Sequence, residues 1–159
     1  MKKRILFVCL GNICRSPAAE GVFLNLLSSK QLTEYYDVDS AGTGGWHVGS
    51  QADSRMRYAA QKRGINILSI SRQIKQEDLY DYDLILAMDN DNLKEIKNLA
   101  KGLNIKLDEK IKLILSYSPD TSLLEVPDPY YGGEKGFEKV LDLLEDACNG
   151  LLEDITLKH

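Results

Sequence analysis

Residues 4–17 read Arg4-Ile5-Leu6-Phe7-Val8-Cys9-Leu10-Gly11-Asn12-Ile13-Cys14-Arg15-Ser16-Pro17. The apolar run that ends at Cys9 has the length and composition of a buried strand, and Gly11 and Asn12 interrupt it. From Pro17 to about Lys30 apolar residues recur at helical spacing, and proline suits the first position of a helix. The segment therefore predicts a strand, a tight turn over residues 9–16 and a helix.

The rest of the chain alternates strand and helix patterns. We expect further strands at residues 35–41, 84–88 and 111–115, helices at 54–63, 76–80, 90–101 and 135–154, and a turn-rich loop at 116–133. Such alternation favours a parallel sheet covered by helices on both faces. Ligands of these folds bind beyond the carboxyl ends of the strands, so the turn after Cys9 and the 116–133 loop should meet at one crevice. We expect a single domain over residues 1–159.

The composition narrows the function classes. The chain has 159 residues and a net charge of -4, which disfavours nucleic acid as a partner. No apolar run approaches the roughly 18 residues of a membrane span, so we expect no membrane insertion and a cytoplasmic location. Three cysteines and two histidines fit neither a disulfide framework nor most metal sites, and we expect no metal and no cofactor.

The turn from Cys9 to Ser16 has the features of a phosphate cradle. A loop of this length can curl its backbone N–H groups around an anion, and Gly11 and Asn12 tolerate the left-handed conformations that curling needs. The following helix adds unpaired N–H groups, and Arg15 can bind two phosphate oxygens at once. This positive environment stabilises a thiolate. Cys9 is therefore a candidate nucleophile, with Ser16 placed to donate a hydrogen bond to its sulfur.

A cysteine that is merely buried in a strand is the alternative interpretation, because free cysteines are often simply buried. The glycine, asparagine, arginine, serine and proline that follow it in register disfavour this alternative. The predicted phosphate-binding residues are Leu10, Gly11, Asn12, Ile13, Cys14, Arg15 and Ser16.

The loop resembles that of the low-molecular-weight protein tyrosine phosphatases. Further segments match motifs of this family in order and approximate spacing, namely Ser40-Ala41-Gly42-Thr43, Trp46-His47-Val48-Gly49, Arg72-Gln73-Ile74 and Asp128-Pro129-Tyr130-Tyr131-Gly132. The resemblance implies a three-layer α/β sandwich, in which helices flank a four-stranded parallel sheet of order 2-1-3-4 and the phosphatase loop follows strand 1. It also implies a metal-independent hydrolase of phosphotyrosine in proteins and of small aryl phosphates. Phosphate or vanadate would inhibit it, and it would be a monomer or a weak dimer.

Asp128 is the candidate general acid. Prolines on both sides restrict its backbone, although an Asp-Pro pair by itself more often marks a turn, and it is the resemblance that implies the acid role. Cys9 would attack phosphorus while Asp128 protonates the departing phenolate, and Asp128 would then activate water to hydrolyse the phosphocysteine. Arg15 and the loop amides would stabilise charge on the phosphoryl oxygens.

The resemblance also implies the walls of the pocket. The side chains of Leu10, Ile13, Trp46, Tyr130 and Tyr131 would line a slot for a phenyl ring, which phosphoserine is too short to fill. For the aromatic residues, core packing or exposed loop tips are the alternative. Relatives that act on phosphoarginine carry threonine at the position of Ile13, which favours phosphotyrosine as the substrate here.

Asn12, Ser16 and Ser40 would brace the loop from beneath. The chain departs from many relatives at Ser69, where they place a histidine, and this leaves open how the loop is supported. Cys14 is either a small buried residue or, as the family suggests, the partner of Cys9 in a reversible disulfide.

Two other functions can be weighed against the phosphatase. A thiol-dependent arsenate reductase on the same scaffold would need further cysteines after the third strand, and residues 87–92 contain none. A non-catalytic phosphate-binding module would be favoured if the nucleophile, the arginine or the acid were missing, yet Cys9, Arg15 and Asp128 are all present. Both alternatives are therefore disfavoured.

Overall fold

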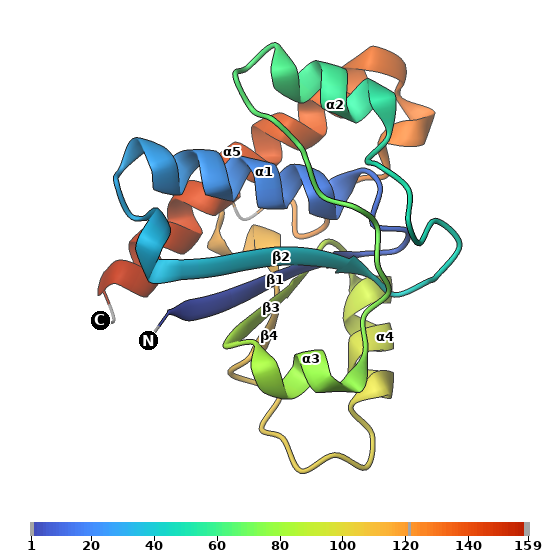
Figure 1. The fold of residues 1–159 in the computed structure, drawn as a ribbon, viewed down its shortest axis with the longest axis vertical. Helices are drawn as coiled ribbons and strands as arrows, with labels where there is room; N and C mark the ends of the chain where they lie inside the picture. The colour runs from blue at the N-terminus through green and yellow to red at the C-terminus, as the bar shows by residue number, and fades with distance from the viewer. Residues whose placement is uncertain (1, 121, 158–159) are drawn as a thin grey trace.

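A computed structural model describes residues 2–120 and 122–157, with Tyr131 described by its backbone only. Its centre is a parallel sheet in the order β2-β1-β3-β4, with helices on both faces (Figure 1). The strands are β1 (Lys3–Cys9), β2 (Tyr36–Gly42), β3 (Leu84–Ala87) and β4 (Ile111–Leu113). The predicted layered α/β fold and strand order are confirmed.

Strand β1 is central because its side chains enter two separate cores. Alternate side chains of a strand point to opposite faces. Ile5 and Phe7 pack into the core formed with α1 (Arg15–Ser29), α2 (Ser54–Gln61) and α5 (Gly133–Leu157). Leu6 and Val8 pack into the core formed with α3 (Gln76–Asp81) and α4 (Asn90–Leu99). This is why the run before Cys9 is apolar at every position.

The two helical layers lie on opposite sides of the sheet. In Figure 1, α1, α2 and α5 lie above it and α3 and α4 below it. The part of the chain that the structure describes also contains the short 3-10 helices η1 (Thr33–Tyr35), η2 (Ile114–Tyr117) and η3 (Pro129–Tyr131). Over residues 2–120 and 122–157, none of the helices is both long enough and apolar enough to cross a bilayer.

Several predicted boundaries were wrong. Helix α1 begins at Arg15 rather than at Pro17, and proline is tolerated at the third position because first-turn N–H groups have no partner inside the helix. Strand β4 ends at Leu113, and the apolar residues after it form η2, whose Ile114 and Leu115 are still buried. A short apolar run does not distinguish these two outcomes. Helix α5 extends beyond the predicted 135–154 at both ends.

A close approach between α5 and η2 predicts an unusual response to mutation. A Cβ added at Gly150 would overlap the carbonyl oxygen of Tyr117. Alanine normally stabilises a helix by about 1 kcal/mol relative to glycine, but here the overlap would force the helix and the turn apart. We expect Gly150→Ala to lower the free energy of unfolding by about 1–3 kcal/mol in urea.

Asp146→Ala, at an exposed position of the same helix, is the control and should not destabilise the protein. A Gly150→Ala protein as stable as the wild type would contradict this packing.

Candidate active site

The turn after β1 curls around the sulfur of Cys9. Asn12 adopts the left-handed conformation, with φ 57°, and its backbone N–H points to Cys9 Sγ at 3.3 Å. Ser16 Oγ lies 2.9 Å from the same sulfur. Gly11 was also expected to be left-handed, but within the fully described loop Asn12 alone has a positive φ. A Cβ at Gly11 would instead come within 3.0 Å of His47, so glycine there serves the contact with His47.

Strand β2 holds the curled loop from one side. Thr43 N donates to Cys9 O and Gly44 N donates to Leu10 O, both at 2.9 Å. The backbones approach so closely that a Cβ at Gly42 would lie 2.7 Å from Leu10 O. The end of β2 therefore sets the path of the loop as it leaves β1.

The N-terminus of α1 points its unpaired groups toward the loop. Cys14 is the N-cap residue and makes no side-chain hydrogen bond to the first turn. First-turn N–H groups without a capping side chain, together with the helix dipole, attract an anion. An anion beside Cys9 would therefore be stabilised by the same helix that carries Arg15.

Arg15 is nearly buried, with 8% exposure, and two acceptors orient it. Its Nη1 donates to Asp89 Oδ2 at 2.7 Å and to the carbonyl of Val126 at 3.0 Å. Asp89 follows β3 and also caps α4 by accepting from Asn92 N at 2.8 Å. Sequence reasoning missed Asp89 because it searched this segment only for cysteines. The available signal was an aspartate at the carboxyl end of a strand next to the loop-bearing strand.

A network of polar side chains braces the loop from beneath. Asn12 Nδ2 donates to Ser16 Oγ at 2.8 Å and to Ser40 Oγ at 3.0 Å. The three side chains predicted to act here are thus joined to one another, and each is at most 1% exposed. This burial makes the network sensitive to the loss of any one partner.

Two residues that closely follow Ser69 make further hydrogen bonds that support the loop. Arg72 N donates to Asn12 Oδ1 and Ser71 Oγ donates to Gly11 O, each at 3.0 Å. Neither contact was predicted, although Arg72 was recognised as part of a family motif. The support that was in doubt at Ser69 therefore comes from the neighbouring residues.

The loop opens into a cavity of about 100 Å³. Most of the residues predicted for the site meet there, and His47 and Pro129 are additions. The lining residues are Cys9, Leu10, Gly11, Ile13, Cys14, Arg15, Trp46, His47, Asp128, Pro129 and Tyr130. Trp46 is 73% exposed, so it lies at the rim. The Tyr131 side chain lies outside the described part, and Asn12, Ser16 and Ser40 lie below the cavity rather than on its wall.

Asp128 comes from the opposite side of this cavity, on the long loop after β4. It caps η3, and its Oδ1 accepts from Tyr130 N at 2.9 Å. This bond ties the carboxyl group to the turn that also carries Tyr130. A small rigid unit thus places a carboxyl and an aromatic side chain together on the cavity wall.

Cys14 and Tyr130 occupy an environment that disfavours negative charge. Burial, reinforced by the carboxylate of Asp53, raises the pKa of Cys14 to about 12. Burial, with the nearby Cys14 and Asp53, also raises the pKa of Tyr130 to about 12. The guanidinium of Arg55 lies 5.0 Å from the centre of the Tyr130 ring and pairs with Asp53 at 2.9 Å. Cys14 is therefore a neutral thiol at neutral pH.

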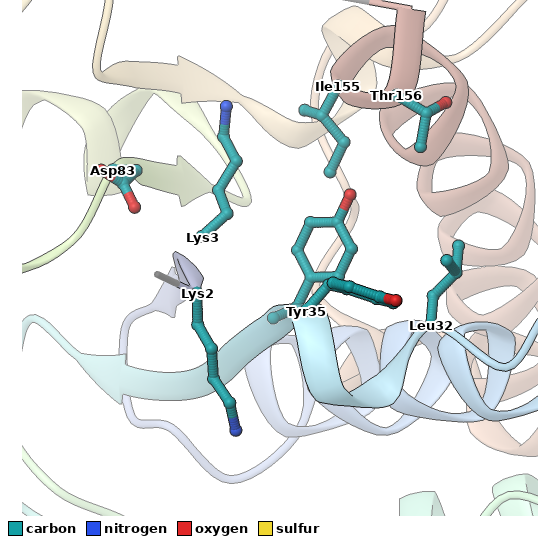
Figure 2. Close-up of a pocket in the computed structure, with 8 residues that line it drawn as sticks. Lys2, Lys3, Leu32, Tyr35, Asp83, Ile155 and Thr156 are labelled. Carbon is teal, nitrogen blue, oxygen red and sulfur yellow. The ribbon is translucent and has the colours of Figure 1, made fainter. Parts of the chain in front are cut away.

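A larger hollow, of about 710 Å³, lies at the other end of the sheet, where β1 and β2 begin. It is lined by Lys2, Lys3, Leu32, Tyr35, Tyr36, Asp83, Ile155 and Thr156. In Figure 2 the side chains of Lys2 and Lys3 point away from one another, so they do not converge on one anion. Among the residues the structure describes, no three His, Cys, Asp or Glu side chains gather as metal ligands would. The loop at Cys9 therefore remains the candidate site.

Known proteins are similar to this chain in both sequence and fold. Residues 4–159 match the family model for low molecular weight phosphotyrosine protein phosphatases. The human protein of that name is 41% identical over 151 residues, 95% of this chain and 94% of its own. The low molecular weight protein-tyrosine-phosphatase YfkJ of Bacillus subtilis is 41% identical over 152 residues, with 95% and 94% covered. A crystal structure of a protein tyrosine phosphatase from Entamoeba histolytica superposes with a TM-score of 0.92, at 46% identity and 99% coverage of both chains. The chain therefore belongs to the family of low-molecular-weight protein tyrosine phosphatases.

Proposed function

We propose that this protein hydrolyses phosphotyrosine in proteins, and small aryl phosphates, with Cys9 as nucleophile, Arg15 as phosphate clamp and Asp128 as general acid and base. The observation that carries the proposal is the position of Cys9 Sγ. It accepts from Asn12 N at 3.3 Å, lies 2.9 Å from Ser16 Oγ, and lines one cavity with Arg15 and Asp128. Hydrogen-bond donors aimed at sulfur favour the thiolate, which is the nucleophilic form.

The reaction proceeds in two steps. Cys9 Sγ forms a bond to phosphorus as the bond to the tyrosyl oxygen breaks, and Asp128 gives its proton to that oxygen. Asp128 then takes a proton from water, whose oxygen attacks phosphorus and displaces the Cys9 thiolate. Arg15 and the amides of residues 10–16 stabilise the three non-bridging oxygens in both steps. The Ser16 hydroxyl stabilises the departing sulfur.

The substrates are tyrosine-phosphorylated proteins in the cytoplasm, and phosphate and vanadate inhibit by occupying the loop. Leu10, Ile13, Trp46 and Tyr130 contact the phenyl ring. We propose that residues 1–159 act as one domain, as a monomer or weak dimer, without metal or other cofactor.

Removal of the nucleophile and of the acid should have different effects. Cys9→Ser is expected to abolish hydrolysis of p-nitrophenyl phosphate in EDTA with a reducing agent. Asp128→Ala should slow it by about 10²–10⁴-fold, as loss of a general acid does, and still bind inorganic phosphate. With wild-type protein, a phosphotyrosine peptide should react and a matched phosphoserine peptide should not.

Cys148→Ala is the matched control, because Cys148 is a core residue in α5 and should leave the rate unchanged. Normal turnover by Cys9→Ser would refute the mechanism. Equal rates on the two peptides would refute the assigned substrate class.

The contact between Arg15 and Asp89 predicts a second effect on activity. Asp89→Asn keeps an N-capping side chain for α4 but removes the charge that orients the guanidinium. A hydrogen bond between charged groups contributes about 1.5–3 kcal/mol, so kcat/KM should fall by roughly 10-fold or more. Asp91→Asn is the control, because Asp91 is exposed and lies two residues further on, in the first turn of α4, and it should not change kcat/KM. If both variants matched the wild type, Arg15 would not depend on Asp89.

We further propose that Cys14 protects Cys9 from irreversible oxidation. Peroxide would oxidise the Cys9 thiolate to a sulfenic acid, and the Cys14 thiol would displace water from it to form a disulfide. After prolonged exposure to peroxide, activity should return with dithiothreitol in the wild type but not in Cys14→Ser, because peroxide would oxidise the unprotected sulfenic acid further to a sulfinic acid that dithiothreitol does not reduce. Equal recovery in the two proteins would rule out this role.

A further inference from the structure

Glu20 is a carboxyl group that the mechanism does not use, although it lies directly behind the phosphate loop. It sits on α1, one turn beyond Ser16, and lines a cavity of about 230 Å³ that shares no lining residue with the cavity at Cys9. Ser69 also lines this cavity, and apart from Glu20 none of the lining residues is charged.

A continuous chain of hydrogen bonds joins Glu20 to the nucleophile. Glu20 Oε1 accepts from Ser40 Oγ at 2.6 Å, and Ser40 Oγ accepts from Asn12 Nδ2 at 3.0 Å. The other hydrogen of that nitrogen goes to Ser16 Oγ at 2.8 Å, and Ser16 Oγ lies 2.9 Å from Cys9 Sγ. All four residues between Glu20 and the cavity that holds the substrate are buried.

The direction of each hydrogen bond in this chain depends on its two ends. An amide has one acceptor side and one donor side, and a hydroxyl has one hydrogen. Arg72 N donates to Asn12 Oδ1, which turns the donor side of Asn12 toward both serines. Ser40 then has to accept from Asn12, so its only hydrogen needs an acceptor, and Glu20 supplies it. Ser16 likewise accepts from Asn12, so its hydrogen can go to Cys9 Sγ at 2.9 Å or to the Ala41 carbonyl at 3.5 Å, and the contact with sulfur is the shorter.

We propose that Glu20 is a positioning residue for the phosphatase reaction: it is the terminal acceptor that keeps Ser40, Asn12 and Ser16 oriented so that Ser16 donates to the Cys9 thiolate. Without that acceptor, the Ser40 hydrogen would compete for Asn12 Oδ1. Rotation of the amide would then turn the Ser16 hydrogen away from sulfur. The inference rests on the role of Cys9 proposed above.

The charges around Glu20 set the pH at which this acceptor is a carboxylate. Burial, together with the carboxylate of Asp39 on β2, raises the pKa of Glu20 to about 7, although the Ser40 hydrogen bond and the Arg72 guanidinium act in the opposite direction. The remaining cavity residues, which come from α1 and from 66–69, carry no charge. Because the folded pKa lies above the ordinary value near 4.3, the carboxylate form costs stability as pH rises through this window. Glu20 is therefore mostly a carboxylate at about pH 8, at some expense to the stability of the fold.

Two substitutions at Glu20 distinguish the loss of the hydrogen-bond acceptor from a change in side-chain volume. Glu20→Gln keeps a carbonyl oxygen that can accept from Ser40, whereas Glu20→Met has nearly the same shape and no strong acceptor. Glu34→Gln is the matched control, an exposed glutamate at the opposite end of β2 from Ser40. Each protein is assayed at about pH 8, where an ordinary glutamate and Glu20 are both ionised. The readouts are kcat on p-nitrophenyl phosphate, the iodoacetamide alkylation rate of Cys9 by mass spectrometry, and Tm.

The two Glu20 variants should lose catalytic and alkylation rate to different degrees. Glu20→Met should lower both kcat and the alkylation rate by about 10-fold or more, because a buried donor left without its acceptor costs about 1–3 kcal/mol. Glu20→Gln should stay within about threefold of the wild type, which corresponds to less than 1 kcal/mol. Glu34→Gln should match the wild type in both rates.

Two outcomes would overturn the proposal. One is a Glu20→Met protein with wild-type kcat and alkylation rate. The other is an equal loss in Glu20→Gln and Glu20→Met, with Tm lowered equally, which would make Glu20 a packing residue only. Failure of the proposed catalytic role is recognised separately, because Cys9→Ser would then retain activity whatever the alkylation rates of the Glu20 variants.

Discussion

The left-handed turn at Asn12 is the constraint on which the site depends. Its backbone N–H points at the Cys9 sulfur, while its side chain is tied to Ser16, Ser40 and the backbone of Arg72. A non-glycine residue with positive φ persists only where the surroundings hold it in place. Here three segments that are distant in sequence hold it, so the phosphate cradle can form only when β1, β2 and the segment before α3 have come together.

The sheet makes that convergence possible. Strand β1 is buried on both faces, and its neighbours β2 and β3 run parallel to it. Their carboxyl ends therefore lie at one edge, where Cys9, Ser40 and Asp89 are separated by many residues in sequence yet belong to one site. Cys9 ends a strand and Arg15 begins a helix, so both are supported by regular structure, whereas Asp128 is held on its loop as the cap of η3. Such support is what a catalytic group needs if its geometry is to be maintained.

The local electrostatics differ from those of the whole chain. A net charge of -4 would by itself repel a phosphorylated substrate. Near Cys9, however, the N-terminus of α1 and the guanidinium of Arg15 face the cavity, and Asp89 balances part of the arginine charge from behind. The buried neutral thiol of Cys14 adds no charge. A compact positive site within an acidic protein selects an anion by position rather than by long-range attraction.

The sequence alone determined the layered fold and, through its family resemblance, the strand order. It also led to the proposed residues of the cradle, because apolar periodicity and the Cys9–Ser16 spacing are local signals. It did not reveal Asp89, Ser71 or the contact of Glu20 with Ser40, since each contact joins residues far apart along the chain. It also misplaced the start of α1, where Pro17 is the third helical residue rather than the first, and the end of β4, where apolar residues pack equally well in either conformation. The reach of a side chain across parallel strands depends on register and burial, and only the tertiary structure decides these.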